Sequence, residues 1–201
     1  MICELDNFMP EYASPIEETL KPLFEFMIDP SKVEFEDDIV LTIKSFIKKG
    51  PKVISPVIWA LYPHLYKVFQ KNKNTFGNLL DTLNHYLISG REVIAQNREY
   101  LVMLVKMAGE AMFSKEPTIS INNSEGAILM QLIFQVFAGT SVLDEHFNEI
   151  LGVVHQRMQT APMQDYLKRH LLSVYLTALA YNSTKTLAFL ESHGILSAFF
   201  E

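Results

Sequence analysis

Two apolar stripes at helical spacing, joined by a short corner, constrain the fold of this chain more than any other feature. They lie in residues 37–70, DDIVLTIKSFIKKGPKVISPVIWALYPHLYKVFQ. The first helix is expected to end at Gly50, because glycine tolerates the left-handed conformation that closes many helices. The second is expected to begin after Ser55 with Pro56 in its first turn, where serine caps the helix and proline needs no N–H partner. Pro63 predicts a kink.

A helix pair of this kind cannot bury both apolar stripes alone, so it predicts similar neighbours. The same pattern recurs along the chain, with Thr75 and Ser124 as expected caps and residues 114–123 as the longest loop. The predicted helices cover residues 15–28, 37–49, 56–70, 76–88, 91–113, 127–138, 142–158, 163–181 and 183–192. The fifth of these helices can break at Gln96-Asn97.

The pairs of helices define the predicted fold class. Their hairpins cover residues 35–71, 75–113, 124–158 and 163–192, and they start about 40 residues apart, which is the period of HEAT and armadillo arrays. The sequence therefore predicts an all-α HEAT-type α-solenoid of about four helical hairpins plus a leading helix, as one array over residues 1–201. The hairpins share no residue motif, and a compact multi-helix bundle is the alternative. The apolar tail, with Phe199 and Phe200, predicts that the array is part of a longer solenoid.

Composition narrows the class of protein. Hydrophobic residues make up 49% and charged residues 20%, which excludes a disordered chain. The net charge of −6 argues against direct nucleic-acid binding and favours basic partners. The single cysteine, Cys3, excludes an internal disulfide framework. The chain shows neither a membrane-spanning run nor a basic secretory leader, so a cytoplasmic or nuclear protein without membrane contact is expected.

Motifs that carry chemistry are missing from the sequence. It lacks the phosphate-binding, dinucleotide-binding, zinc-protease and serine-hydrolase patterns, and its six histidines are scattered. His146 and His155 are nine residues apart, so they would lie on opposite sides of one helix and could not share a metal ion. The sequence predicts no enzyme, no cofactor and no metal site.

Acidic residues are the candidate contacts for basic protein cargo. One group comprises Glu36, Asp37 and Asp38, and the other comprises Asp144, Glu145 and Glu149. The first group opens a helix, where it can simply stabilise the helix dipole. The second group is expected on the second helix of the third pair, which helical arrays commonly turn toward their inner face. A solvated surface is the alternative for both groups.

Aromatic residues at helical spacing around the first corner suggest either a peptide pocket or a core. They are Trp59, Tyr62, Phe69 and Phe76. Because aromatic side chains at this spacing usually bury large apolar areas, the core is the expected location.

The most distinctive residues of the corner resemble a known family. Ser55-Pro56, Trp59 and Pro63 look like a segment of the importin-beta superfamily of transport receptors, closest to the importin-seven and importin-eight type. The corner around Tyr181-Asn182 is also similar, although Ser183 stands where relatives often carry proline. The resemblance covers about residues 34–192 but only a small part of such a receptor.

That resemblance implies HEAT repeats and non-catalytic, Ran-dependent transport of protein cargo between cytoplasm and nucleus through the nuclear pore. It implies basic protein cargo as a partner, with the Ran GTPase and Phe-Gly nucleoporins as partners of the full-length receptor. The matching aromatic and proline positions transfer no contact residue, because they are core and corner positions. A generic helical-repeat scaffold for protein–protein interaction is the alternative function.

Overall fold

The chain folds into helices joined by turns, without a strand in the residues that the structure describes. In this computed structural model these are residues 13–29, 31, 35–50, 52–113, 120–160 and 165–197, with only the backbone described for residues 13, 14, 36 and 120–122. The expectations on Cys3 and on Phe199 and Phe200 fall outside these residues. No helix among them is long and apolar enough to span a bilayer.

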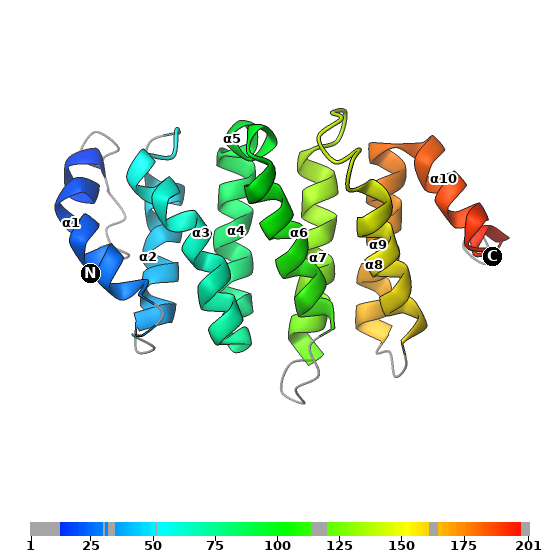
Figure 1. Cartoon of the computed structure of the whole chain (residues 1–201), viewed down its shortest axis with the longest axis horizontal. Helices are drawn as coiled ribbons and strands as arrows, with labels where there is room; N and C mark the ends of the chain where they lie inside the picture. Colours follow the sequence, from blue (N-terminus) through cyan, green and yellow to red (C-terminus); the bar gives the residue numbers. More distant parts are fainter. Residues whose placement is uncertain are drawn as a thin grey trace. The chain divides into compact units, whose positions relative to one another are not determined.

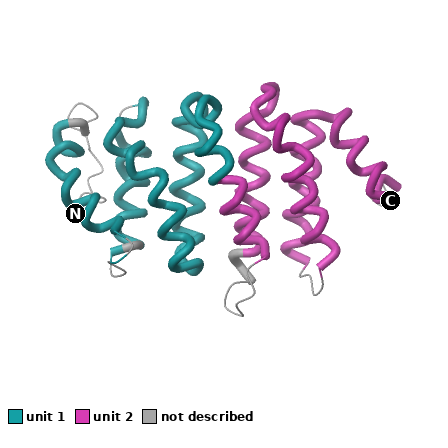
Figure 2. Tube along the Cα trace, viewed as in Figure 1, with its two compact units in different colours: residues 1–103 teal, residues 104–201 magenta. Residues whose placement is uncertain are grey.

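The helices divide into two compact units, residues 1–103 and 104–201 (Figure 2). The first unit holds α1 (Ala13–Met27), α2 (Glu36–Lys49), α3 (Pro56–Lys71), the 3-10 turn η4 (Lys73–Thr75), α4 (Phe76–Ser89) and α5 (Arg91–Gln96). The division falls within α6 (Arg98–Met112). The second unit continues with α7 (Ser120–Val136), α8 (Phe147–Gln159), α9 (Asp165–Tyr181) and α10 (Ser183–Ser192). The single array over residues 1–201 stays a prediction.

Each unit is built by packing alternate helices of the chain against each other. In the first unit α2 lies along α4 while α1 packs against α3, and in the second unit α7 lies along α9 (Figure 1). Side-by-side stacking of equivalent helices from successive hairpins is how helical repeats bury their apolar stripes, since each repeat contacts its neighbours. The structure confirms the prediction of an all-α helical-repeat fold of the solenoid type.

The corner between α2 and α3 is confirmed in its residues but not in its backbone conformation. Ser55 caps α3, with its Oγ accepting a hydrogen bond from the Ile58 backbone nitrogen at 3.2 Å, and Pro56 is the first residue of the helix. Gly50 ends α2 with φ −78° and ψ −167°, so the expected left-handed conformation is wrong. α3 runs as one helix through Pro63, and the kink there stays a prediction.

Two expected helix caps differ from the sequence prediction. α7 begins at Ser120, so Ser124 is not a cap but a buried residue inside the helix. Thr75 precedes α4 as expected, yet its hydroxyl makes no capping bond and donates to the Asn72 carbonyl at 2.8 Å. Neither side chain therefore caps a helix: Ser124 is buried within α7, and the Thr75 hydroxyl bonds to the preceding turn.

Apart from the start of α8, which lies at Phe147 instead of residue 142, the remaining boundaries follow the sequence closely. The helix predicted over residues 91–113 breaks at Asn97, where α5 ends and α6 begins. Asn182 caps α10, its side chain accepting a bond from the Lys185 backbone nitrogen at 3.0 Å. Asparagine is among the best capping residues because its short side chain reaches the unpaired backbone nitrogens of the first turn.

Aromatic residues contribute several of the largest side chains to the core of the first unit. Tyr62, Phe69 and Phe76 are fully buried, as predicted. The Tyr62 hydroxyl donates to the carbonyl of Tyr100 at 3.3 Å. Burial raises the pKa of Tyr62 well above its ordinary value, so this hydroxyl keeps its proton at neutral pH. Trp59 differs from the other three, because it is only partly buried.

Candidate functional site

The acidic residues predicted from the sequence lie in two places, one in each unit. Glu36, Asp37 and Asp38 are the first three residues of α2. Both aspartates are exposed, and the side chain of Glu36 lies outside the described residues. Phe35 precedes the helix and offers no side-chain cap, so negative charge in this first turn also stabilises the helix N-terminus.

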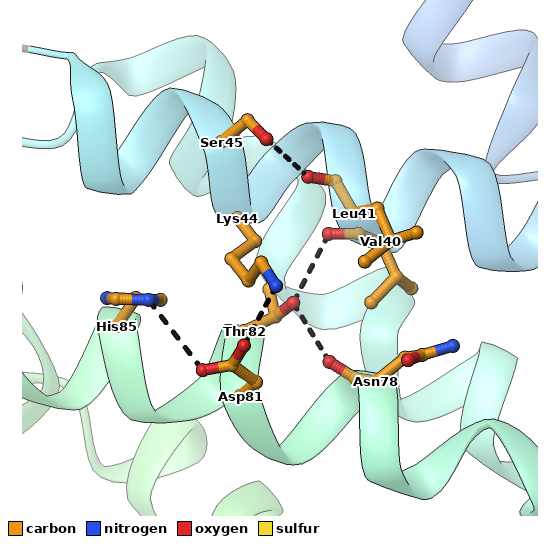
Figure 3. Close-up of polar contacts among 8 residues, drawn as sticks. All are labelled: Val40, Leu41, Lys44, Ser45, Asn78, Asp81, Thr82 and His85. Carbon is orange, nitrogen blue, oxygen red and sulfur yellow. Dashed lines mark hydrogen bonds and ion pairs between the residues drawn. The ribbon is translucent and has the colours of Figure 1, made fainter. Parts of the chain in front are cut away.

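Asp37 is tied to the neighbouring repeat. Its Oδ1 accepts a hydrogen bond from Asn78 Nδ2 on α4 at 3.1 Å. Asn78 belongs to a row of polar contacts between α2 and α4, in which the Thr82 hydroxyl donates to the Val40 carbonyl at 3.2 Å (Figure 3). Asp37 therefore helps to hold two repeats together, while Asp38 is exposed beside it.

An ion pair extends this row toward the other end of α2. Lys44 Nζ lies 2.8 Å from Asp81 Oδ2, and His85 Nε2 lies 3.7 Å from Asp81 Oδ1 (Figure 3). The hydrogen bond from Lys44 is the main cause that lowers the pKa of Asp81, and the charge of His85 acts in the same direction. Burial lowers the pKa of His85, against the pull of Asp81. These charges serve packing between α2 and α4.

The structure corrects the predicted location of the second acidic group. Asp144 and Glu145 lie in turns before α8, which begins at Phe147, so only Glu149 lies on the helix. Residues 142–146 form turns, with backbone bonds from Asp144 to Ser141 and from His146 to Leu143. Leu143 is one of the apolar residues that suggested a helix from Val142, and it is buried although it lies in a turn.

Asp144 is held by the last hairpin. It accepts a bond from the Tyr181 hydroxyl at 3.1 Å and forms an ion pair with Lys185 at 3.1 Å. Burial is the largest cause that raises the pKa of Tyr181, to about 12, so the phenol stays protonated and can donate. Asp144 thereby fastens α9 and α10 to the turn before α8.

Glu145 and Glu149 are the more accessible members of this group. Both are exposed, and 68% of the Glu149 side chain is exposed even though Oε2 lies 3.3 Å from His146 Nδ1. An exposed carboxylate near a weakly bound histidine can exchange that contact for a cation of a partner at small cost. The structure brings Asp144, Glu145 and Glu149 together within one short stretch of the second unit.

The sequence did not predict one exposed feature of the first unit. Trp59 was expected in the core, but it lines a surface pocket of about 290 Å³ beside the exposed aliphatic residues Val53, Ile88 and Val93. The only signal in the sequence is that Val53 and Ile88 fall outside the apolar stripes of their neighbouring helices. Among the described side chains, no group of three or more His, Cys, Asp or Glu is arranged to hold a metal ion.

Comparison with known proteins gives one informative match. No protein-family model and no solved structure matches the chain. It is 21% identical, over 201 aligned positions, to a probable importin-7 homolog of Dictyostelium discoideum. The alignment covers 96% of this chain and 18% of the relative, so the chain spans less than a fifth of that protein. The similarity, with the helical-repeat fold, indicates a relationship to importins.

Proposed function

We propose that this chain is a non-catalytic helical-repeat segment of an importin-type nuclear transport receptor that contacts basic protein cargo. The observation that carries the proposal is the similarity to an importin-7 homolog along 96% of the chain. The stacking of α2 on α4 and of α7 on α9 supports it, because transport receptors need extended repeat surfaces. The net charge of −6 favours basic partners.

Exposed carboxylates are the proposed contact groups. Glu145 and Glu149 in the second unit, and Asp38 in the first, present negative charge to solvent. Asp144 and Asp37 accept hydrogen bonds from within the chain. They therefore contribute to the negative electrostatic potential of the surface and hold neighbouring residues in position. Glu36 completes the first group. Opposite charges across an interface mainly accelerate association and select partners.

The longer receptor would carry the rest of the activity. Release of cargo by the GTP-bound Ran GTPase, and contact with Phe-Gly nucleoporins at the nuclear pore, are proposed for that receptor. Movement between cytoplasm and nucleus follows from the same proposal. A helical-repeat scaffold without Ran-dependent release is the competing function.

A binding assay with a charge-matched control tests the cargo contact. The double variant Glu145→Gln with Glu149→Gln should bind a lysine-rich nuclear protein, such as a linker histone, several-fold more weakly, with a reduced salt dependence. The control Glu99→Gln with Asp165→Asn removes the same charge from exposed positions elsewhere. Equal loss in both variants would mean that only net charge matters and would remove these residues as contacts.

Transport itself is tested on the longer receptor. The cargo complex is expected to dissociate when Ran loaded with a non-hydrolysable GTP analogue is added, and to persist with Ran·GDP. Persistence under both conditions would instead support the scaffold function.

A further inference from the structure

Two histidines of the second unit meet where α10 ends. His155 lies on α8, and His193 directly follows α10. Their ring centroids are 4.9 Å apart, with an interplanar angle of 67°. Phe189 completes the group, because its ring stacks on His193 with centroids 4.0 Å apart and lies 6.2 Å from the ring of His155. Two ionisable rings therefore form part of the contact between α8 and the end of α10.

The hydrogen bonds of the two rings differ in what a further proton would do to them. Gln159 Nε2 lies 2.9 Å from His155 Nε2, and because an amide nitrogen only donates, this ring nitrogen accepts and carries no proton. His193 Nδ1 lies 2.9 Å from the carbonyl oxygen of Phe189, so this nitrogen carries a proton and donates. His193 can therefore take a second proton on Nε2 and keep its bond, whereas a proton on Nε2 of His155 breaks the bond from Gln159.

The surroundings of His155 also oppose a positive charge on its ring. His155 is half-buried, while His193 is exposed. Burial is the main cause that lowers the pKa of His155 from its ordinary value near 6.5, and the charge of His193 lowers it further. A cation loses hydration when it is partly buried, and here it also meets a like charge. Both effects favour the neutral ring of His155 in this contact.

Charged groups on the surrounding helices do not offset this repulsion. Besides the pair, the charged or ionisable residues of α8, α9 and α10 include Glu149 and Arg157, then Asp165, Lys168, Arg169 and His170, then Lys185 and Glu191. Among the described residues, His193 is the one group whose charge shifts the pKa of His155. Glu149 instead contacts His146, and Lys185 pairs with Asp144. No carboxylate in this part of the chain is therefore placed to stabilise a charged His155.

We propose that His155 and His193 form a pH-sensitive contact, which holds the end of α10 against α8 while His155 is neutral and releases it when both rings are protonated. Because the pKa of His155 is lowered in the folded state, the stabilisation is fully present above the ordinary value near 6.5. It is lost as pH falls from there through the lower folded value. Release would expose Phe189, which is 6% exposed in the closed contact. The contact uses none of the acidic residues proposed to bind cargo, so either proposal can fail without the other.

Titration of the histidine ring protons by nuclear magnetic resonance, in the whole chain, tests the coupling between the rings. His193→Gln and His193→Lys are a matched pair, because both remove the ring that stacks on Phe189 and they differ in charge. The pKa of His155 should be at least about half a pH unit higher in the glutamine variant than in the lysine variant, since like charges interact appreciably at this distance in a partly buried site. Equal pKa values of His155 in the two variants would overturn the coupling.

Hydrogen exchange of the backbone amides of α10 tests the release. After correction for the intrinsic exchange rate, their protection should fall about tenfold between about pH 7.5 and about pH 5.5, as expected when one pKa differs by about one unit between the closed and released states. In His155→Gln the protection should stay constant within about twofold, because this side chain cannot be charged. His170→Gln is the control, since the ring of His170 contacts Tyr166 on the same helix, with centroids 4.6 Å apart, and its loss should leave the pH response unchanged.

Three results would contradict the proposal. The release is wrong if the protection of α10 in the unsubstituted chain is the same at both pH values, even when the two rings prove to be coupled. A fall in protection that persists in His155→Gln would assign the pH response to another group. An equal fall in α7 and α10 would mean that the whole second unit opens in acid, instead of the end of α10 alone. Circular dichroism of each variant at both pH values verifies that the helices remain folded.

Discussion

The phenol oxygen of Tyr181 accepts a hydrogen bond from the backbone nitrogen of Leu143 at 3.0 Å, across 38 residues of chain. The same hydroxyl donates to Asp144, so the end of α9 fixes the turn that leads into α8. Phe147 stacks near the same ring, with centroids 5.9 Å apart. One side chain thus joins the last hairpin to the preceding one and satisfies a buried amide that no helix uses.

Tyr181→Phe should destabilise the second unit by about 1–3 kcal/mol, because it leaves the Leu143 amide buried and unpaired. Hydrogen exchange at Leu143, together with urea unfolding followed by circular dichroism, measures the effect. Tyr166→Phe is the control, since Tyr166 is 58% exposed and its change should stay within about 0.5 kcal/mol. Unchanged exchange at Leu143 in the Tyr181 variant would contradict the assigned bond.

Glu17 makes the first unit sensitive to pH. It is 2% exposed on α1, where Ser55 donates to its carboxylate, and Oε2 lacks a partner among the described residues. Burial is the main cause that raises the pKa of Glu17 above its ordinary value near 4.5. A raised pKa in the folded state means that the stabilisation is fully present below the ordinary value and is lost as pH rises through the folded value.

Glu17→Gln should therefore stabilise the first unit at pH 7. At pH 4 most of this stabilisation should disappear, because the glutamate of the unsubstituted chain is already protonated there. Urea unfolding followed by Trp59 emission at both pH values measures the difference from the unsubstituted chain. Glu18→Gln, at the exposed neighbouring position, should change stability little at either pH. A stability gain that is the same at both pH values would contradict the role of ionisation.

The Lys44–Asp81 pair should contribute little and be sensitive to salt. The side chains are 26% and 53% exposed, and exposed pairs couple by about 0.2–1 kcal/mol. A double-mutant cycle with Lys44→Ala and Asp81→Ala measures this coupling, which should shrink at 1 M salt because the Debye length falls to about 3 Å. The lowered pKa of Asp81 means that its contribution is present above its ordinary value near 3.8 and disappears as pH falls through the folded value. A coupling independent of salt would point to packing instead of charge.

Arg157 holds two helix ends in the second unit. It is 7% exposed on α8, and its Nε donates to the Met112 carbonyl at the end of α6 at 2.8 Å. Its Nη1 donates to the Thr160 carbonyl at 2.9 Å. Arg157→Gln should cost about 2–3 kcal/mol, because hydrogen bonds from a charged donor are strong. Arg169→Gln, at an exposed position, should be nearly neutral in the same urea titration.

Two glycines in the second unit should respond in opposite directions to alanine. A Cβ on Gly126 would stand 2.6 Å from the Ala108 carbonyl oxygen, so Gly126→Ala should force α6 and α7 apart and cost about 1–3 kcal/mol. Gly152 lies inside α8 with no atom within 4 Å of its added Cβ, so Gly152→Ala should stabilise by about 0.5–1 kcal/mol. Thermal or urea unfolding of both variants checks the pair. If both variants were destabilised, helix propensity would not be what determines the stability change at Gly152.

Local sequence determined most of the helices. The cap at Ser55 and the break at Asn97 depend on residues within one turn, so patterns of apolar spacing and capping chemistry predict them. The fold class follows from the same patterns, because successive amphipathic pairs must stack to bury their stripes. The sequence also identified the candidate acidic residues, but it gave only their residue types and their positions along the chain.

Tertiary structure decided what local patterns could not. α7 extends back to Ser120 through a polar segment, and it passes α6 closely because Gly126 has no side chain. Residues 142–146 form turns because the hydroxyl of Tyr181 takes the Leu143 amide, which removes Asp144 and Glu145 from the predicted helix. Trp59 reaches the surface because Tyr100 and Gly90 fix its ring at the corner. Each outcome depends on a contact between residues far apart in sequence, whose energy no local pattern contains.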